Sequence, residues 1–214
     1  MGLESTLLAN SLLDKCSKFD ISLFHLIFIG NLVEKNFETL VDVLGKHDQK
    51  HDDVLLNSTG SLLIIQTVSF LDEYNHHLKS LDEDEKAVVL MIKKSLKPAV
   101  DEINKWKDLR KFRNIALAHN LRNVKTNESI FNDGFYIYDI PKTGADLLVL
   151  YQCVVMIKRA FENGFDDKLM SVKYALSKKG RTVTSPRFRD ADESVTALQS
   201  IAELINKNTE SWDC

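Results

Sequence analysis

Apolar residues recur at steps of three and four along most of the chain, the spacing expected for one buried face of an α-helix. The pattern predicts helices over residues 3–18, 20–46, 60–80, 82–97, 98–120, 145–165, 166–177 and 191–206. Asp20 is placed as an N-cap, Ser80 with Glu83 matches a capping box, and Pro98 should kink or restart the chain. The sequence therefore predicts an all-α helical bundle of about six to eight helices.

The segment from 121 to 144 is the least helical part of the chain. Its Asn132-Asp133-Gly134 turn, between "SIF" and "FYIYDI", predicts a small β-hairpin near residues 129–139. The charged run 46–53 and the basic stretch 177–189 are expected to be connections. Since no repeat or domain boundary is evident, we expect a single helical domain over residues 1–214.

Composition agrees with a globular helical protein of the cytoplasm. Only 8 glycines and 3 prolines interrupt a chain that is 44% hydrophobic and 28% charged. The three cysteines follow no metal-ligand or disulfide spacing, which favours a reducing compartment and no bound metal or cofactor. The apolar run 21–33 contains His25 and Asn31 and is too short to span a bilayer, so no membrane association is expected.

Candidate chemistry lies in the stretch "RKFRNIALAHN", residues 110–120. On a helical wheel, Arg113 falls near the middle of the apolar arc that contains Trp106 and Phe112, and His119 falls just beyond the edge of that arc. A basic side chain on an apolar arc requires a partner, because an unpaired buried charge is costly. That partner is either an internal acid or a ligand.

The charge of this region is opposite to that of the whole chain. Residues 105–125 hold seven Lys or Arg residues against the single acid Asp108, a local balance of +6 in a chain whose net charge is -3. The sequence therefore predicts positive potential near this helix, which would attract a phosphate-rich partner such as RNA.

Arg113, Asn114, the intervening "IALA" and His119 resemble the Rx4-6H signature of the HEPN superfamily, which includes a polar residue directly after the arginine. The surrounding pattern is most similar to bacterial abortive-infection and toxin-type members. The resemblance implies a metal-independent, homodimeric endoribonuclease of phage defence or of a toxin–antitoxin pair. It also implies an antitoxin partner, although Leu121 stands where some toxin members carry a modified tyrosine.

The residue types fit that chemistry. His119 would act as general base or acid in the attack of a 2′-hydroxyl on its own phosphate, and Arg113 would stabilise the charge of that phosphate. Asn114 would orient the phosphate or His119 by hydrogen bonding. Arg110, Lys111 and Arg122 are expected to guide the RNA backbone. Positions six apart on a helix differ by about 120° and about 9 Å of rise, so either the helix deforms near Asn114 or Arg113 of one chain meets His119 of another. The position of Arg113 on the apolar arc favours the dimer.

Two alternatives to a nuclease remain open, and a metal site is a competing signal. The chain could be a non-catalytic HEPN-like module that binds nucleotide, RNA or protein, or an unrelated helical protein with Arg113 in an internal ion pair. Asp72 and Glu73 are the acids expected to neutralise Arg113 or to hold His119. His47 and His51 have a spacing able to bind a divalent metal on one helical face.

Overall fold

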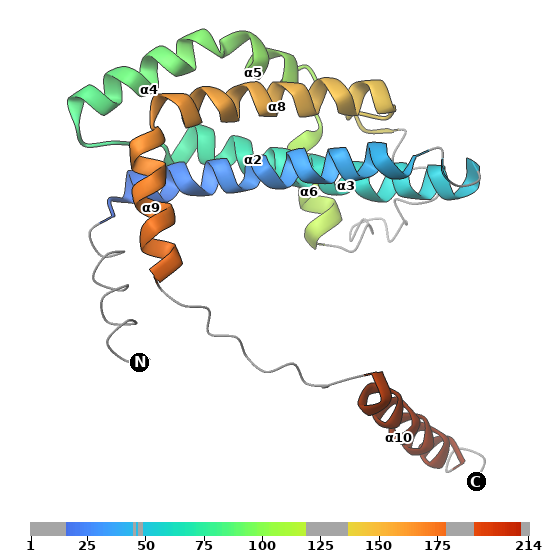
Figure 1. The fold of residues 1–214 in the computed structure, drawn as a ribbon. Coiled ribbons are helices and arrows are strands. Elements are labelled where there is room, and N and C mark those ends of the chain that lie inside the picture. The colour runs from blue at the N-terminus through green and yellow to red at the C-terminus, as the bar shows by residue number, and fades with distance from the viewer. Residues whose placement is uncertain (1–15, 45, 47–48, 119–136, 179–190, 211–214) are drawn as a thin grey trace. The chain divides into compact units, whose positions relative to one another are not determined.

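The computed structural model of the chain describes residues 16–44, 46, 49–118, 137–178 and 191–210. Its elements are α2 (Lys18–Val43), α3 (Gln49–Asp72), the π-helix η1 (Glu73–His77), α4 (Glu83–Ser95), α5 (Lys97–Ile103), α6 (Leu109–Ala118), α8 (Gly144–Gly164), α9 (Asp166–Lys178) and α10 (Ala191–Glu210). All regular structure in these ranges is helical (Figure 1), and the all-α prediction is confirmed.

The chain divides into two compact units, residues 1–179 and residues 180–214. The second unit contains α10, an amphipathic helix that exposes Val195, Leu198 and Ile201. The expectation of one domain over residues 1–214 stays a prediction.

The core of the first unit lies where α2, α3 and α8 pack together (Figure 1). Leu23 of α2, Ile64 of α3 and Ile157 of α8 are each at most 1% exposed. Helices α4 and α5 cover α8, α9 packs on α2 and α8, and α6 packs on α3. Burial of these apolar faces is the main force that holds the helices together.

One segment meets the length and hydropathy of a membrane-crossing helix in the part of the chain that the structure describes, namely Val54–His77. It covers most of α3 together with η1. Leu63, Ile64 and Val68 of this segment are buried against other helices, as expected for the central helix of a bundle. The expected lack of membrane association stays a prediction.

Two predicted N-caps are wrong, by three residues at α2 and by two residues at α4. The N-cap of α2 is Ser17, whose hydroxyl accepts from Asp20 N at 3.1 Å, while the Asp20 carboxylate accepts from Ser17 N at 2.8 Å. This reciprocal pair is a capping box in which Asp20 is the third helical residue. Similarly, α4 is capped by Asp82, which accepts from Glu85 N at 2.9 Å.

Ser80 does not cap α4 as predicted. It is 8% exposed, and its hydroxyl donates to the Glu85 carboxylate and accepts from Asp82 N at 3.0 Å. The hydroxyl therefore braces the loop before α4. The chain does restart near Pro98, which lies in the first turn of α5.

Two further helix boundaries differ from the predictions. Helix α3 begins at Gln49, inside the predicted charged connection, and continues into η1. The predicted helix 98–120 is interrupted between α5 and α6, so Trp106 does not belong to the helix that carries Phe112 and Arg113. Residues 137–139 form no strand, and the rest of the predicted hairpin near 129–139 lies outside the described residues.

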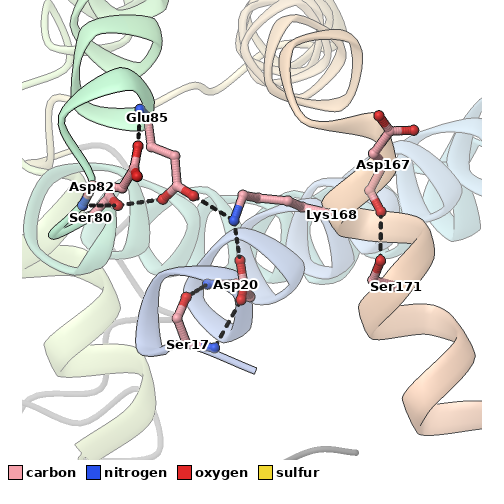
Figure 2. A network of polar contacts seen from close by, with 8 residues as sticks. All are labelled: Ser17, Asp20, Ser80, Asp82, Glu85, Asp167, Lys168 and Ser171. Carbon is pink, nitrogen blue, oxygen red and sulfur yellow. Dashed lines mark hydrogen bonds and ion pairs between the residues drawn. The ribbon is translucent and has the colours of Figure 1, made fainter. Parts of the chain in front are cut away.

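Lys168 connects three helix ends of the first unit (Figure 2). Its ammonium lies 3.3 Å from Asp20 Oδ1 at the start of α2 and 2.5 Å from Glu85 Oε1 in α4. The bond to Glu85, more than the bond to Asp20, raises the pKa of Lys168. The ion pairs fix α9 against the starts of α2 and α4.

Candidate functional site

The orientation of α6 is set by a contact between Asp108 and Asp139. Asp108 N donates to Asp139 O at 3.2 Å, and Asp139 N donates to the Asp108 carboxylate at 3.0 Å. The Asp139 carboxylate also accepts from Lys107 N at 3.2 Å. Because these bonds satisfy backbone groups that a continuous helix would use, the chain stops after α5 and begins again at Leu109.

The apolar side of α6 is anchored in the core. Leu109 is 4% exposed and Phe112 is completely buried. The Phe112 ring meets the Tyr138 ring edge to face, with 6.0 Å between the centroids. This packing directs Arg110 and Arg113 to the end of α3.

One carboxylate joins the two arginines. Asp72 Oδ1 accepts from Arg110 Nη1, and Asp72 Oδ2 accepts from Arg113 Nη1. The side chains of Arg113 and Asp72 are 21% and 25% exposed, and that of Arg110 is 48% exposed. The sequence leaves either an internal acid or a ligand open as the partner of Arg113, and the structure shows the internal acid Asp72. The sharing of that acid with Arg110 was not predicted.

Protonation of Asp72 is disfavoured in this setting. Partial burial by itself raises the pKa of the carboxyl, but the hydrogen bonds and charges of Arg113 and Arg110 outweigh burial and hold the pKa below its ordinary value. The carboxylate is consequently charged at neutral pH and offsets one of the two guanidinium charges.

Asn114 holds Arg113 from a second side. Its Oδ1 accepts from Arg113 Nε at 3.3 Å and from Arg113 Nη2 at 3.2 Å. The guanidinium of Arg113 is thus held between Asp72 and Asn114, which restricts its orientation. Arg113 and Asn114, adjacent in the predicted motif, also interact directly in space.

Among the other predicted site residues, the structure describes only Lys111, which takes no part in the contacts with Asp72. Lys111 is exposed, and its ammonium lies 5.1 Å from the centroid of the Tyr138 ring. His119 and Arg122 lie outside the described residues. The structure therefore joins Arg110 and Arg113 through Asp72, and Asn114 to both through Arg113.

The positive charge counted along the sequence is partly balanced in space. Lys105 Nζ lies 2.5 Å from Glu102 Oε2, and Asp72 and Asp139 reach α6 and its preceding turn from distant parts of the chain. The local balance of +6 is a property of the sequence window, and the folded region presents a smaller positive charge. Sequence counting cannot find these acids because they lie outside the window.

Glu73, the first residue of η1, has one oxygen without a hydrogen-bond partner. Its Oε1 lies 3.9 Å from His25 Nδ1, whereas the buried Oε2 has none within the described ranges. Glu73 directly follows Asp72, so the end of α3 presents two carboxylates in succession. π-Helical turns are frequent at functional sites because they change the register of a helix locally.

A second polar cluster, which sequence reasoning missed, lies between α2 and α8. The Lys158 side chain is 6% exposed, and its ammonium donates to the Glu34 carboxylate and to Asn31 Oδ1 at 2.9 Å. The hydrogen bond from Lys158 lowers the pKa of Glu34 most, and Arg159 adds to the effect from 3.4 Å. The only signal in the sequence is a lysine inside the apolar run "VVMIKRAF".

A pocket of about 720 Å³ lies along α9 beside the start of α2. Its charged lining includes Asp20 and Lys168, which pair with each other. Burial, and then the charge of Asp20, raises the pKa of the Cys16 thiol at its rim. A raised pKa lowers the thiolate fraction, so Cys16 is not an activated nucleophile.

No group of three potential metal ligands occurs among the residues that the structure describes. His47 of the alternative metal site lies outside those residues. The expectation that the protein uses no metal or cofactor stays a prediction.

Comparisons with protein-family models, with curated proteins and with solved structures found no match to this chain. The resemblance to the HEPN superfamily therefore depends on the Arg113-Asn114-x4-His119 motif and the helical architecture.

Proposed function

We propose that the protein is a metal-independent endoribonuclease of the HEPN type. One observation carries the proposal, which is that Arg110, Arg113 and Asn114 form a single cluster on α6 with solvent access. The guanidinium planes suit two oxygens of a phosphodiester. A third motif residue, His119, follows on the same segment.

In the proposed reaction, the ribose 2′-oxygen attacks the adjacent phosphorus and the bond from phosphorus to the 5′-oxygen breaks. His119 takes the 2′-hydroxyl proton as general base or supplies a proton to the departing 5′-oxygen as general acid. Arg113 stabilises the charge of the pentacoordinate phosphorane and Asn114 keeps Arg113 oriented. Arg110, Lys111 and Arg122 bind the RNA backbone on either side.

The proposed active unit is a homodimer in the cytoplasm, with Arg113 of one chain and His119 of the other acting on one phosphate. The HEPN resemblance suggests a role in phage defence or in a toxin–antitoxin pair with an antitoxin protein. Because Arg113 and His119 are six positions apart, they point in different directions on one helix, and a dimer allows residues of two chains to reach the same phosphate.

A second candidate function is a non-catalytic HEPN-like module that binds nucleotide, RNA or protein. The ion pairs of Asp72 with Arg113 and Arg110 occupy guanidinium donors that catalysis would use, which favours a non-catalytic protein, either this module or an unrelated helical protein in which Arg113 is structural. The two functions differ in whether bound RNA is cleaved.

The test is cleavage of labelled single-stranded RNA in the presence of EDTA by the wild type, Arg113→Ala and His119→Ala. We expect products with 2′,3′-cyclic phosphate ends from the wild type and a loss of at least about 100-fold in both variants. Arg159→Ala is the matched control, since this arginine is 65% exposed and lies on α8. Binding without cleavage would select the module, and neither binding nor cleavage would leave Arg113 a structural residue.

A mixing experiment tests the shared site. Arg113→Ala and His119→Ala chains, each inactive, should recover about a quarter of wild-type activity when they are unfolded and refolded together, because heterodimers have one intact pair of the two. Absence of any recovery would show that both residues act within one chain.

A further inference from the structure

We propose that the Asp72 carboxylate occupies the position of a substrate phosphodiester between Arg110 and Arg113, so that RNA binds by displacing Asp72 from both arginines. The inference rests on the proposed function, because it concerns the regulation of the same site. It assigns Asp72 as an internal competitor, in place of a permanent structural partner of Arg113.

The Asp72 carboxylate and a phosphodiester are matching anions. Each carboxylate oxygen of Asp72 bonds a different guanidinium, Oδ1 with Arg110 and Oδ2 with Arg113. A phosphodiester likewise has two non-bridging oxygens and one negative charge, and guanidinium groups bind carboxylates and phosphates with the same donor geometry. One anion can therefore replace the other, oxygen for oxygen.

The ion pairs of Asp72 with Arg110 and Arg113 are accessible to solvent. Asp72 and Arg113 are about a quarter and a fifth exposed, and Arg110 is about half exposed, so solvent reaches the ion pairs. Ion pairs with such access are weak compared with buried ones, because water solvates both partners once they separate. Displacement of Asp72 into water is thus feasible for a ligand that adds further contacts of its own.

Asn114 orients Arg113 independently of Asp72. Asn114 Oδ1 accepts from Nε and Nη2 of Arg113, whereas Asp72 accepts from Nη1. Arg113 therefore stays oriented after Asp72 leaves, with its Nη1 group available for a phosphate oxygen. A partner needed only for orientation would be redundant with Asn114.

The test measures binding separately from cleavage, with a short single-stranded RNA whose 2′-hydroxyls are all methylated. We expect Asp72→Asn to bind this RNA about tenfold more tightly than the wild type at equal salt. The variant adds one net positive charge at the site, so the slope of log affinity against log salt should steepen by up to roughly 0.7.

Glu102→Gln is the matched control. Glu102 pairs with Lys105 near α6, so the variant removes one negative charge and releases one cation without contact to Arg110 or Arg113. We expect its affinity to stay within about twofold of the wild type. An equal gain in both variants would overturn the inference, because the effect would then come from net charge.

Failure of this inference is distinct from failure of the proposed nuclease. Tighter binding by Asp72→Asn supports the competition, whether or not unmodified RNA is cleaved. Unchanged or weaker binding overturns it, even if the wild type cleaves RNA. Should Asp72→Asn fail to fold, the side-chain carboxyl ¹³C resonance of Asp72 in the wild type provides the test, since it must shift when the methylated RNA saturates the protein, and an unshifted resonance refutes displacement.

Discussion

The buried lysine between α2 and α8 allows a stability prediction with a defined magnitude. Replacing Lys158 by Met keeps most of the length of the side chain and removes its charge. Glu34 then loses the ammonium bonded to its Oε2, and Asn31 loses a donor at 2.9 Å. The Glu34 side chain is only 19% exposed, so water replaces its lost bond poorly, whereas Asn31 is exposed and can bond to water instead.

The expected cost lies below that of a fully buried pair. Removing one partner of a buried ion pair costs about 3–5 kcal/mol. The Glu34 side chain is 19% exposed and keeps Arg159 at 3.4 Å. We therefore expect Lys158→Met to lower the free energy of unfolding by about 2.5 kcal/mol and Glu34→Gln by about 1.5 kcal/mol.

Urea unfolding followed by circular dichroism measures these values. With a slope of about 3 kcal/mol per molar, the midpoint of Lys158→Met should fall by about 0.8 M. The double variant should be no less stable than Lys158→Met alone, a coupling of about 1.5 kcal/mol. The control is Lys86→Met, which breaks an exposed pair with Glu83 and should cost at most about 0.5 kcal/mol. Equal losses at the two lysines, or additive effects in the double variant, would refute the reasoning.

Two other predictions concern Gly30 and Lys168. A Cβ at Gly30 would lie 2.9 Å from Cγ and Cδ of Lys158, so Gly30→Ala should lower the free energy of unfolding by about 1–2 kcal/mol, whereas Gly144→Ala, with nothing within 4 Å, should be neutral or slightly stabilising in the same urea assay. Lys168→Met should reduce stability most between about pH 5 and pH 10. Burial alone raises the pKa of Asp20, but bonds from Ser17 and Lys168 lower it overall below 3.8, so the contribution of the pair disappears as acid protonates Asp20. The bond to Glu85 raises the pKa of Lys168 above 10.5, so the contribution also disappears as alkali deprotonates the lysine, and a difference between wild type and variant that is independent of pH would contradict this account.

Most helices could be predicted from the sequence because their signals are local. Apolar periodicity predicted helices over 145–165 and 166–177, and the structure places α8 at Gly144–Gly164 and α9 at Asp166–Lys178. The predicted helix starts were less accurate, because each start has two polar residues able to cap it. These are Ser17 and Asp20 at α2, and Ser80 and Asp82 at α4. The break before α6 was not predicted, because it depends on Asp139, whose contacts with 107 and 108 span more than 30 residues.

The sequence by itself determined the helical class, the adjacency of Arg113 and Asn114, and the need of Arg113 for a partner, either an acid or a ligand. Only the tertiary structure decided that Asp72, 41 residues earlier, meets this need and binds Arg110 at the same time. It also decided that Lys158 lies inside the bundle with Glu34, 124 residues away. Helix formation follows from neighbours along the chain, whereas charge pairing depends on which helices pack together, and that packing is selected by the apolar core as a whole.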